Sequence, residues 1–329
     1  MCRGPQPHQD ARFSAVPEPP HTPTSATRRP TGIRWLLAPA TDDVPRSHAA
    51  AATALRVLLG LMWLYNVSWK RAPDFGQDAG NGLYKFTSYA VSHPVLPPYS
   101  WLVEHLVLKA FTPFGWVVLI AETTLAVLLL TGTWVRLAAA LGVAQSIAIA
   151  LSVAYAPDEW PWSYWLMIGA HVVVLFSSAG RMLAVDGVRA GLPTGRTLGT
   201  VWGSLTVLVG LYTAVASLGD PLASKGPTLG STDLSISLGA YNLPGALVLV
   251  VAGALLLLAS QTGSRRSAQG AAVLAALAGL SLHAQLGFTD PLLGGTATSA
   301  AYYLSVTVVG WCLAQDPRRH PHVDDHSPH

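Results

Sequence analysis

The chain has 329 residues, of which 51% are hydrophobic and only 11% are charged, with a formal net charge of +3. The apolar residues fall in blocks of about twenty, and a helix of that length crosses a hydrocarbon core about 30 Å thick. The composition therefore predicts an integral membrane protein and excludes a nucleic-acid-binding protein, which needs a basic face. The two cysteines, Cys2 and Cys312, form no CxxC motif, and no metal-ligating motif is present, so neither thiol redox chemistry nor a metal site is expected.

The apolar blocks and the segments between them divide the chain into four regions. Residues 1–47 are rich in Pro, Arg, Ser and Thr, and we expect them to form a disordered cytosolic tail. Eight candidate transmembrane helices follow, at about 49–69, 113–132, 135–155, 164–180, 198–218, 243–260, 268–288 and 297–314. A polar link divides them into two sets of four, at 48–190 and 191–315, and residues 316–329 are predicted to be a disordered, His-rich cytosolic tail. The predicted fold class is therefore an all-α, polytopic membrane helix bundle.

The segment between the first two spans carries an amphipathic pattern near residues 100–111. In "YSWLVEHLVLKAF", Trp101, Leu102 and Leu106 recur at helical spacing opposite Glu104 and Lys109. This pattern is typical of a helix that lies in the plane of the membrane interface.

The basic residues predict the orientation of the spans. Of the 20 lysines and arginines, five fall on the side opposite both termini: Lys70, Arg71, Lys85, Lys109 and Lys225. Arg56 lies within a span, and all the others lie on the side of the termini, which the positive-inside rule assigns to the cytoplasm. We therefore expect a multi-pass protein of the bacterial cytoplasmic membrane, surrounded by the lipid bilayer, with both termini inside; the excess of Arg over Lys and the abundant Ala are typical of a high-GC bacterial genome.

The ionisable and amide side chains inside the first set of spans include Arg56, Glu122, Gln145 and His171. At about 1.5 Å per residue, the last three lie roughly 13 to 15 Å from the inner ends of their spans and Arg56 about 10 Å. A spacing of seven also places Trp63 and Lys70 on the same helix face as Arg56. We therefore predict one polar layer near the midplane, in which Arg56 pairs with Glu122.

Two interpretations of this layer stay open. In the structural one, the ion pair joins two helices, His171 makes an interhelical hydrogen bond and Gln145 contributes to packing. In the functional one, the layer is a proton or substrate site, because intramembrane ionisable groups are costly and are commonly functional. The second set of spans carries no Asp, Glu, Lys or Arg in the hydrocarbon region, which is typical of a scaffold or of an oligomerisation or lipid-facing platform.

The first set of spans resembles a known membrane family. The segments are "RVLLGLMWLYNVSWK", "GWVVLIAETTLAVLLLTGTWVRLAAALG" and "YWLMIGAHVVVLFSSAGRMLAVDGV", the last including a Gly-Arg-x-x-x-x-Asp motif. In order and in the spacing of their charges they resemble the DoxX/DoxD-like integral membrane proteins over about residues 55–188. The resemblance implies a redox-linked membrane subunit similar to the small subunit of thiosulfate:quinone oxidoreductase, which oxidises thiosulfate and passes the electrons to a membrane quinone.

The resemblance and the polar residues together suggest a quinone-linked oxidoreductase subunit with a non-covalently bound membrane quinone. In this hypothesis the catalytic residues are Glu122, which passes protons, His171, which donates a hydrogen bond, and Arg56, which keeps Glu122 ionised. The expected quinone and substrate contacts are Trp63, Gln145, Tyr164, Lys70, Arg71 and Lys85, with the three cations drawing an anion such as thiosulfate. Electrons would come from a soluble or membrane redox partner subunit.

Two other functions stay open, and the chain can also be a homo-oligomer. One is a non-catalytic membrane anchor or assembly protein for oxidoreductase or envelope complexes. The other is a small-molecule transporter, although the two halves show no paired Gly/Pro interruptions of the kind that broken transporter helices carry.

Overall fold

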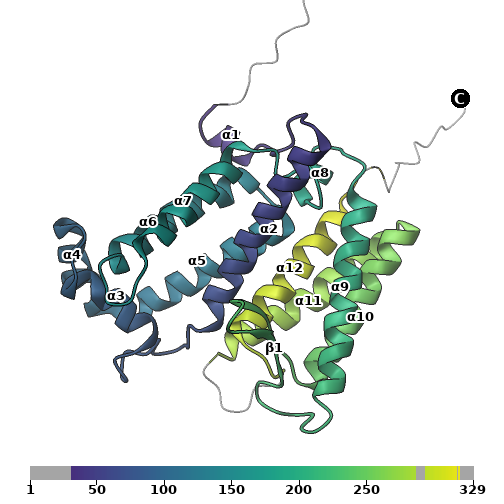
Figure 1. Ribbon diagram of the computed structural model, residues 1–329. Helices are drawn as coiled ribbons and strands as arrows, with labels where there is room; N and C mark the ends of the chain where they lie inside the picture. The colour runs from purple at the N-terminus through teal and green to yellow at the C-terminus, as the bar shows by residue number, and fades with distance from the viewer. Residues whose placement is uncertain (1–30, 287–292, 317, 319–329) are drawn as a thin grey trace, which may run out of the picture.

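The structure is a computed structural model that describes residues 31–286, 293–316 and 318, and it is a helix bundle with one short hairpin (Figure 1). The helices that form the bundle are α2 (Arg46–Ser68), α5 (Phe111–Thr131), α6 (Val135–Val153), α7 (Pro161–Phe176), α9 (Gly195–Ala216), α10 (Leu243–Thr262), α11 (Arg265–Ala284) and α12 (Ala297–Ala314). The shorter elements are α1 (Ile33–Leu37), α3 (Gly82–Ser92), α4 (Pro97–Leu102), η1 (Val103–Val107), η2 (Leu108–Ala110), α8 (Val185–Arg189), β1 (Thr228–Ser231) and β2 (Ile236–Ala240).

Among the described residues, seven helices are long and apolar enough to cross a membrane. Six of them are α2, α6 and α9 to α12, and the seventh joins α5 to the preceding turns as Pro97–Thr131. The remaining predicted span corresponds to α7, a shorter apolar helix of 16 residues. The predicted all-α polytopic bundle is therefore confirmed, and each predicted block coincides with one helix; residues 287 and 288, at the end of the seventh block, lie outside the described residues.

Helix α12 joins the two sets of spans. It packs against α9, α10 and α11 of its own set and also against α2 and α5 of the first set. In Figure 1 α12 accordingly lies between α2 on one side and α9 on the other. This central position explains why α12 is the most buried of the seven candidate spans, with 78% of its apolar segment buried.

The tight turn between α5 and α6 depends on Gly132. This residue has φ +67°, and a Cβ atom there would lie 2.4 Å from the Cβ of Ala184 and 2.6 Å from Nη1 of Arg56. Only glycine adopts this backbone conformation without strain and also leaves room for the neighbouring segment. The turn makes α5 and α6 antiparallel neighbours.

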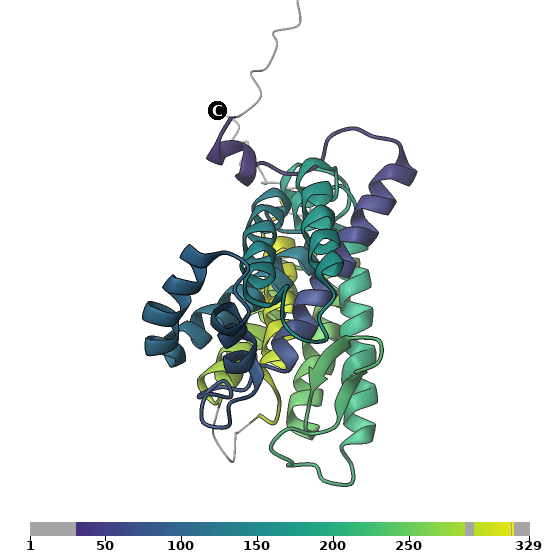
Figure 2. The same cartoon turned by 60° about the vertical axis from the view of Figure 1, so that its left-hand side comes forward.

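The segment between α2 and α5 is more helical than expected. Helix α3 was not predicted, whereas the amphipathic helix expected near residues 100–111 is present as α4, η1 and η2, with η1 in π-helical geometry. Figure 2 shows this blue part of the chain projecting to one side of the bundle. Helix α3 nevertheless contacts α6, so the segment closes one side of the space between the spans.

The end of the predicted N-terminal tail is ordered. Residues 1–30 lie outside the described residues, but residues 31–47 contain α1 and the start of α2, and they dock on the first set. Arg136 donates hydrogen bonds to the carbonyl of Pro39 (3.1 Å) and to the carboxylate of Asp42 (2.6 Å). Arg181 pairs with Asp43 at 2.7 Å, so arginines hold a segment whose composition suggested disorder. Of the predicted C-terminal tail, only residues 316 and 318 are described.

The hairpin β1–β2 lies in the long link between α9 and α10 and was also not predicted. It is antiparallel, with Gly230 opposite Ser237, and β2 packs against α2 and α12. The Ser299 hydroxyl donates to the Ala240 carbonyl (2.6 Å) and accepts from the Ala240 amide (3.0 Å). The hairpin thus ties the start of α12 to the end of the link.

Candidate functional site

The first set of helices borders a cavity of about 940 Å³ that is partly open to the outside. Its walls come from α2, α5, α6 and α7, and residues of the 70–82 loop, α3 and α4 complete the lining. The aromatic lining residues are Tyr65, Trp69, Phe75, Phe86, Tyr99, Phe114 and Tyr164. A space of this size, with apolar and aromatic walls and a few polar groups, is typical of small-molecule sites.

A buried ion pair lies on the wall of this cavity. The Lys70 ammonium contacts the Glu122 carboxylate, and the two side chains are only 1% and 2% exposed. The Gln145 amide approaches the second Glu122 oxygen at 3.5 Å. Burial lowers the pKa of Lys70, and the negative charge of Glu122 opposes that shift.

The predicted pairing of Arg56 with Glu122 is wrong. Arg56 is fully buried and donates instead to the carbonyls of Leu129 (2.5 Å) and Leu130 (3.1 Å) at the end of α5, and to those of Met182 (3.4 Å) and Leu183 (2.9 Å). Glu122 precedes Leu129 by seven residues, which is about 10 Å along the helix. Arg56 therefore joins the end of α5 to the segment that follows α7.

His171 and Trp63 form a separate contact. The Trp63 indole N–H donates to His171 Nε2 at 2.9 Å, and His171 Nδ1 lies 2.8 Å from the Met167 carbonyl. A ring that accepts at Nε2 and donates at Nδ1 is neutral. Gly142 makes room for this ring, because a Cβ atom at that position would lie 2.1 Å from it. Both ring nitrogens are thus engaged within the protein.

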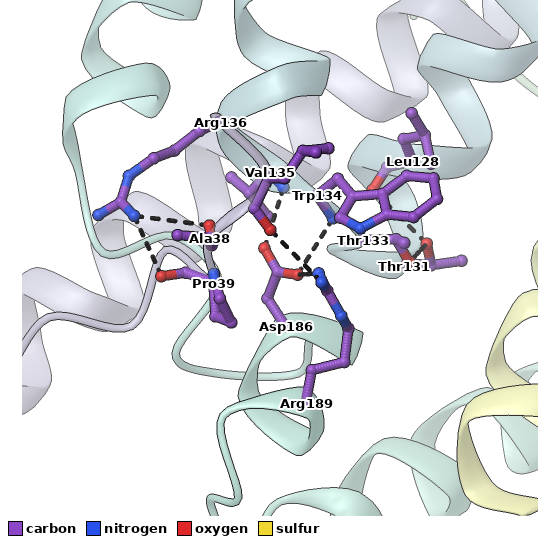
Figure 3. A network of polar contacts seen from close by, with 11 residues as sticks. Ala38, Pro39, Leu128, Thr131, Thr133, Trp134, Val135, Arg136, Asp186 and Arg189 are labelled. Carbon is purple, nitrogen blue, oxygen red and sulfur yellow. Dashed lines mark hydrogen bonds and ion pairs between the residues drawn. The ribbon is translucent and has the colours of Figure 1, made fainter. Parts of the chain in front are cut away.

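The Gly-Arg-x-x-x-x-Asp motif ends in a buried carboxylate that holds the turn between α5 and α6. Asp186 accepts hydrogen bonds from the backbone amides of Trp134 (3.1 Å) and Val135 (3.0 Å) and from Arg189 (2.7 Å), as Figure 3 shows. These amides belong to the start of α6, where N–H groups lack partners within the helix and favour negative charge. The motif therefore supports the turn.

The structure separates the predicted site residues into two groups. Five of them line the cavity: Lys70, Arg71, Glu122, Gln145 and Tyr164. The other four, Arg56, Trp63, His171 and Lys85, are not among its lining residues. The predicted single polar layer is thus divided into the Glu122–Gln145 contact, the Trp63–His171 contact and the separate Arg56 site.

Several polar residues of the cavity were missed, among them Tyr99, Ser152 and Glu159. The Tyr99 hydroxyl lies 2.9 Å from Ser152 Oγ, and Tyr164 donates to the Glu159 carboxylate. The sequence could have indicated Ser152, because it lies seven residues after Gln145 on the same face of α6. Tyr99 and Glu159 lie in the connections outside the predicted spans, where helical periodicity gives no register.

The fixed charges of the lining favour a neutral ligand over an anion. The lining contains two basic residues, Lys70 and Arg71, and three acidic ones, Asp74, Glu122 and Glu159. Because Lys70 and Glu122 neutralise each other, one exposed cation faces two carboxylates. The three cations proposed to draw an anion therefore do not act together, and Lys85 instead lies 5.9 Å from the Tyr89 ring centre.

Comparisons with known proteins add no relative. No family model matches the chain, and neither a curated protein nor a solved structure matches it. Within the part of the chain that the structure describes, no group of three or more His, Cys, Asp and Glu side chains is placed to hold a metal ion.

Proposed function

We propose that this protein is the membrane subunit of a quinone-linked redox system and that it binds the quinone ring in the cavity between α2, α5, α6 and α7. The observation that carries the proposal is the buried Lys70–Glu122 pair, with Gln145 beside it, on the wall of an aromatic cavity of about 940 Å³. Flat aromatic walls suit a ring, and a few buried polar groups suit its oxygen atoms.

The charges that line the cavity favour a quinone over thiosulfate as its ligand. A membrane quinone is neutral, so the surplus of carboxylates in the lining does not repel it, whereas a thiosulfate dianion gains nothing there. We therefore assign this cavity to the quinone. A partner subunit then oxidises the electron donor. The predicted resemblance to DoxX/DoxD-like proteins agrees with this role.

Quinone binding by protein in lipid nanodiscs tests the proposal. Ala148 lines the cavity, whereas Ile147 precedes it on the same helix, is 43% exposed and does not line the cavity. Ala148→Trp fills the space, and Ile147→Trp is the matched control. We expect saturable binding of a short-chain quinone to the wild type and to Ile147→Trp, above its partition into empty nanodiscs. Equal binding by Ala148→Trp would contradict the proposal.

A second candidate is a non-catalytic anchor for redox or envelope enzymes. It is favoured by buried charged side chains that connect separate segments of the chain. Arg56 donates to four backbone carbonyls, and Asp186 accepts from two backbone amides and from Arg189. The two candidates differ in what Ala148→Trp does in native membranes. An anchor keeps its partner and the complex keeps its activity, whereas a quinone-binding subunit keeps its partner and loses electron transfer to quinone.

A further inference from the structure

The hydrogen-bond donors of the Lys70 ammonium are all engaged within the protein. An ammonium group has three N–H donors. One contacts the Glu122 carboxylate, a second donates to the Asn66 carbonyl at 3.0 Å, and the nitrogen lies 3.9 Å from the centre of the Trp69 ring. The three directions are therefore occupied by a carboxylate, a carbonyl and an aromatic face. Lys70 has no donor left for a carbonyl oxygen of a ligand.

Three hydroxyl groups of the cavity are engaged in the same way. The Ala148 carbonyl lies within hydrogen-bond distance of both Ser152 Oγ (2.9 Å) and the Tyr99 hydroxyl (3.2 Å), and the two hydroxyls lie 2.9 Å from each other. One of them donates to this carbonyl, and the other donates to the carbonyl or to its neighbouring hydroxyl. Tyr164 donates to Glu159. A hydroxyl has a single proton to donate, so each of these three has given its proton to a protein acceptor.

Acceptor capacity, by contrast, is left over. An ionised carboxylate offers about four lone-pair directions. One Glu122 oxygen is in contact with Lys70, and the other meets only the Gln145 amide, at the long distance of 3.5 Å. Glu159 likewise has one oxygen beyond the one that accepts from Tyr164. The buried end of the cavity at Glu122 therefore suits a ligand that brings O–H donors, and Gln145 has an amide proton left for the oxygen of the same group. The guanidinium of Arg71, which also lines the cavity, belongs to an exposed residue.

We propose that the cavity selects the reduced form of its ligand, a hydroquinone, over the oxidised quinone, with a ring hydroxyl donating to Glu122 and accepting from Gln145. This inference rests on the proposed function and adds the redox state of the bound molecule. An oxidised quinone has only acceptor oxygens, so it would set a carbonyl oxygen against the carboxylate. A hydroxyl in the same place makes a charge-assisted hydrogen bond.

The selection has a consequence for the bound redox couple. A hydrogen bond to a charged group favours the form that makes it by about tenfold or more in affinity. A site that binds the two-electron reduced form about tenfold more tightly raises the midpoint potential of the bound couple by about 30 mV. The cavity thus favours arrival of electrons on the bound quinone.

Anaerobic binding of three matched rings tests the inference. The probes are a short-chain hydroquinone, its quinone and the dimethyl ether of the hydroquinone, which keeps the ring and has no O–H donor. We expect the hydroquinone to bind about tenfold or more tightly than either of the others. Equal affinity for the three, or tighter binding of the quinone, would overturn the inference and leave quinone binding intact. If none of the rings binds, the proposed function itself is wrong.

A charge-free variant assigns the preference to Glu122. The single change Glu122→Gln strands the buried Lys70 cation and risks unfolding, so the informative variant is Lys70→Met with Glu122→Gln. In the folded double variant we expect the hydroquinone to lose its advantage over the dimethyl ether. A preference that survives in the double variant would show that another group recognises the hydroxyl and would overturn the role of Glu122.

Discussion

The two sets of helices bury polar groups in different ways. The first set buries ionisable side chains: Arg56, Lys70, Glu122, Arg136 and Asp186. The buried polar residues within α9 to α12 are hydroxyl side chains, such as Thr206, which donates to the Trp202 carbonyl of its own helix at 2.7 Å. Hydroxyls of this kind need no partner helix, whereas each buried charge needs a partner from another segment.

The two sets also differ in what lies between their helices. Helix α9 meets α10 through glycines: a Cβ at Gly203 would lie 3.0 Å from the Gly253 carbonyl, and one at Gly210 would lie 2.8 Å from the backbone of Val250. Small residues allow such close backbone contact in membranes. The first set instead borders a cavity that carries one of its ion pairs on the wall. The comparison indicates a scaffold in the second set and a binding site in the first.

The largest effect is expected from breaking the Lys70–Glu122 pair. Lys70→Met leaves a buried carboxylate without its cation and should lower the free energy of unfolding by about 3–5 kcal/mol. The double variant Lys70→Met with Glu122→Gln should recover most of this loss, as SDS-titration unfolding in a double-mutant cycle measures. Arg56→Met with Glu122→Gln is the contrasting pair, and rescue of folding in that pair would restore the original Arg56–Glu122 assignment.

Arg56→Met should have the next largest effect. It leaves four backbone carbonyls without their donor, among them two at the end of α5, and we expect a loss of about 3 kcal/mol in unfolding free energy. Arg266→Met, at an exposed position on α11, is the control and should change stability by less than about 0.5 kcal/mol. Thermal unfolding in detergent compares the two. A loss no larger than that of the control would show that Arg56 does not join these segments.

A glycine substitution in the second set tests close helix packing, whereas the two changes above test buried charges. Gly203→Ala places a methyl group 2.8 Å from Cγ of Leu257, and overpacking of this kind costs about 1–3 kcal/mol. Gly270→Ala makes the same change on α11, where the nearest atom is 3.5 Å away, and should be neutral or slightly stabilising. Equal thermal stability of the two variants would contradict the close backbone contact of α9 with α10 at Gly203.

The smallest effect is expected at the Trp63–His171 contact. Trp63→Phe removes the indole N–H that His171 Nε2 accepts and should cost about 1 kcal/mol from the lost hydrogen bond, in addition to the smaller ring. Trp165→Phe, at a position 67% exposed on α7, is the matched control and should change little. Because neither residue lines the cavity, quinone binding should be unchanged in both.

The sequence was informative about spans and faces but not about partners. The spacing of Arg56, Trp63 and Lys70 predicted one inward face, and all three are buried. Depth counted from helix ends then paired Arg56 with Glu122, because Lys70 was taken as a marker of the membrane surface. In the structure Lys70 is buried beside the 70–82 loop that lines the cavity, and Lys70, not Arg56, pairs with Glu122. Side chains from connecting segments complete the site, and periodicity within the spans cannot place them.

The connecting segments also explain the other misses. Asp186 lies in α8, a helix of five residues, and acts on α6 through backbone amides that any residue carries. The docked segment before α2 is rich in Pro and polar residues, and tertiary contacts hold it, among them those with Arg136 and Arg181. Such contacts depend on tertiary structure and leave no pattern in the local sequence.

Photoaffinity labelling compares the two sets of helices directly, with a quinone that carries a photoreactive group on its ring and with the labelled peptides mapped by mass spectrometry. We expect labelling at the end of α2, on the Gln145–Ser152 face of α6 and at the start of α7, suppressed by excess unlabelled quinone and by Ala148→Trp. Labelling spread evenly over the exposed faces of α9 and α10, or unaffected by competitor, would show that the first set of helices does not hold the binding site.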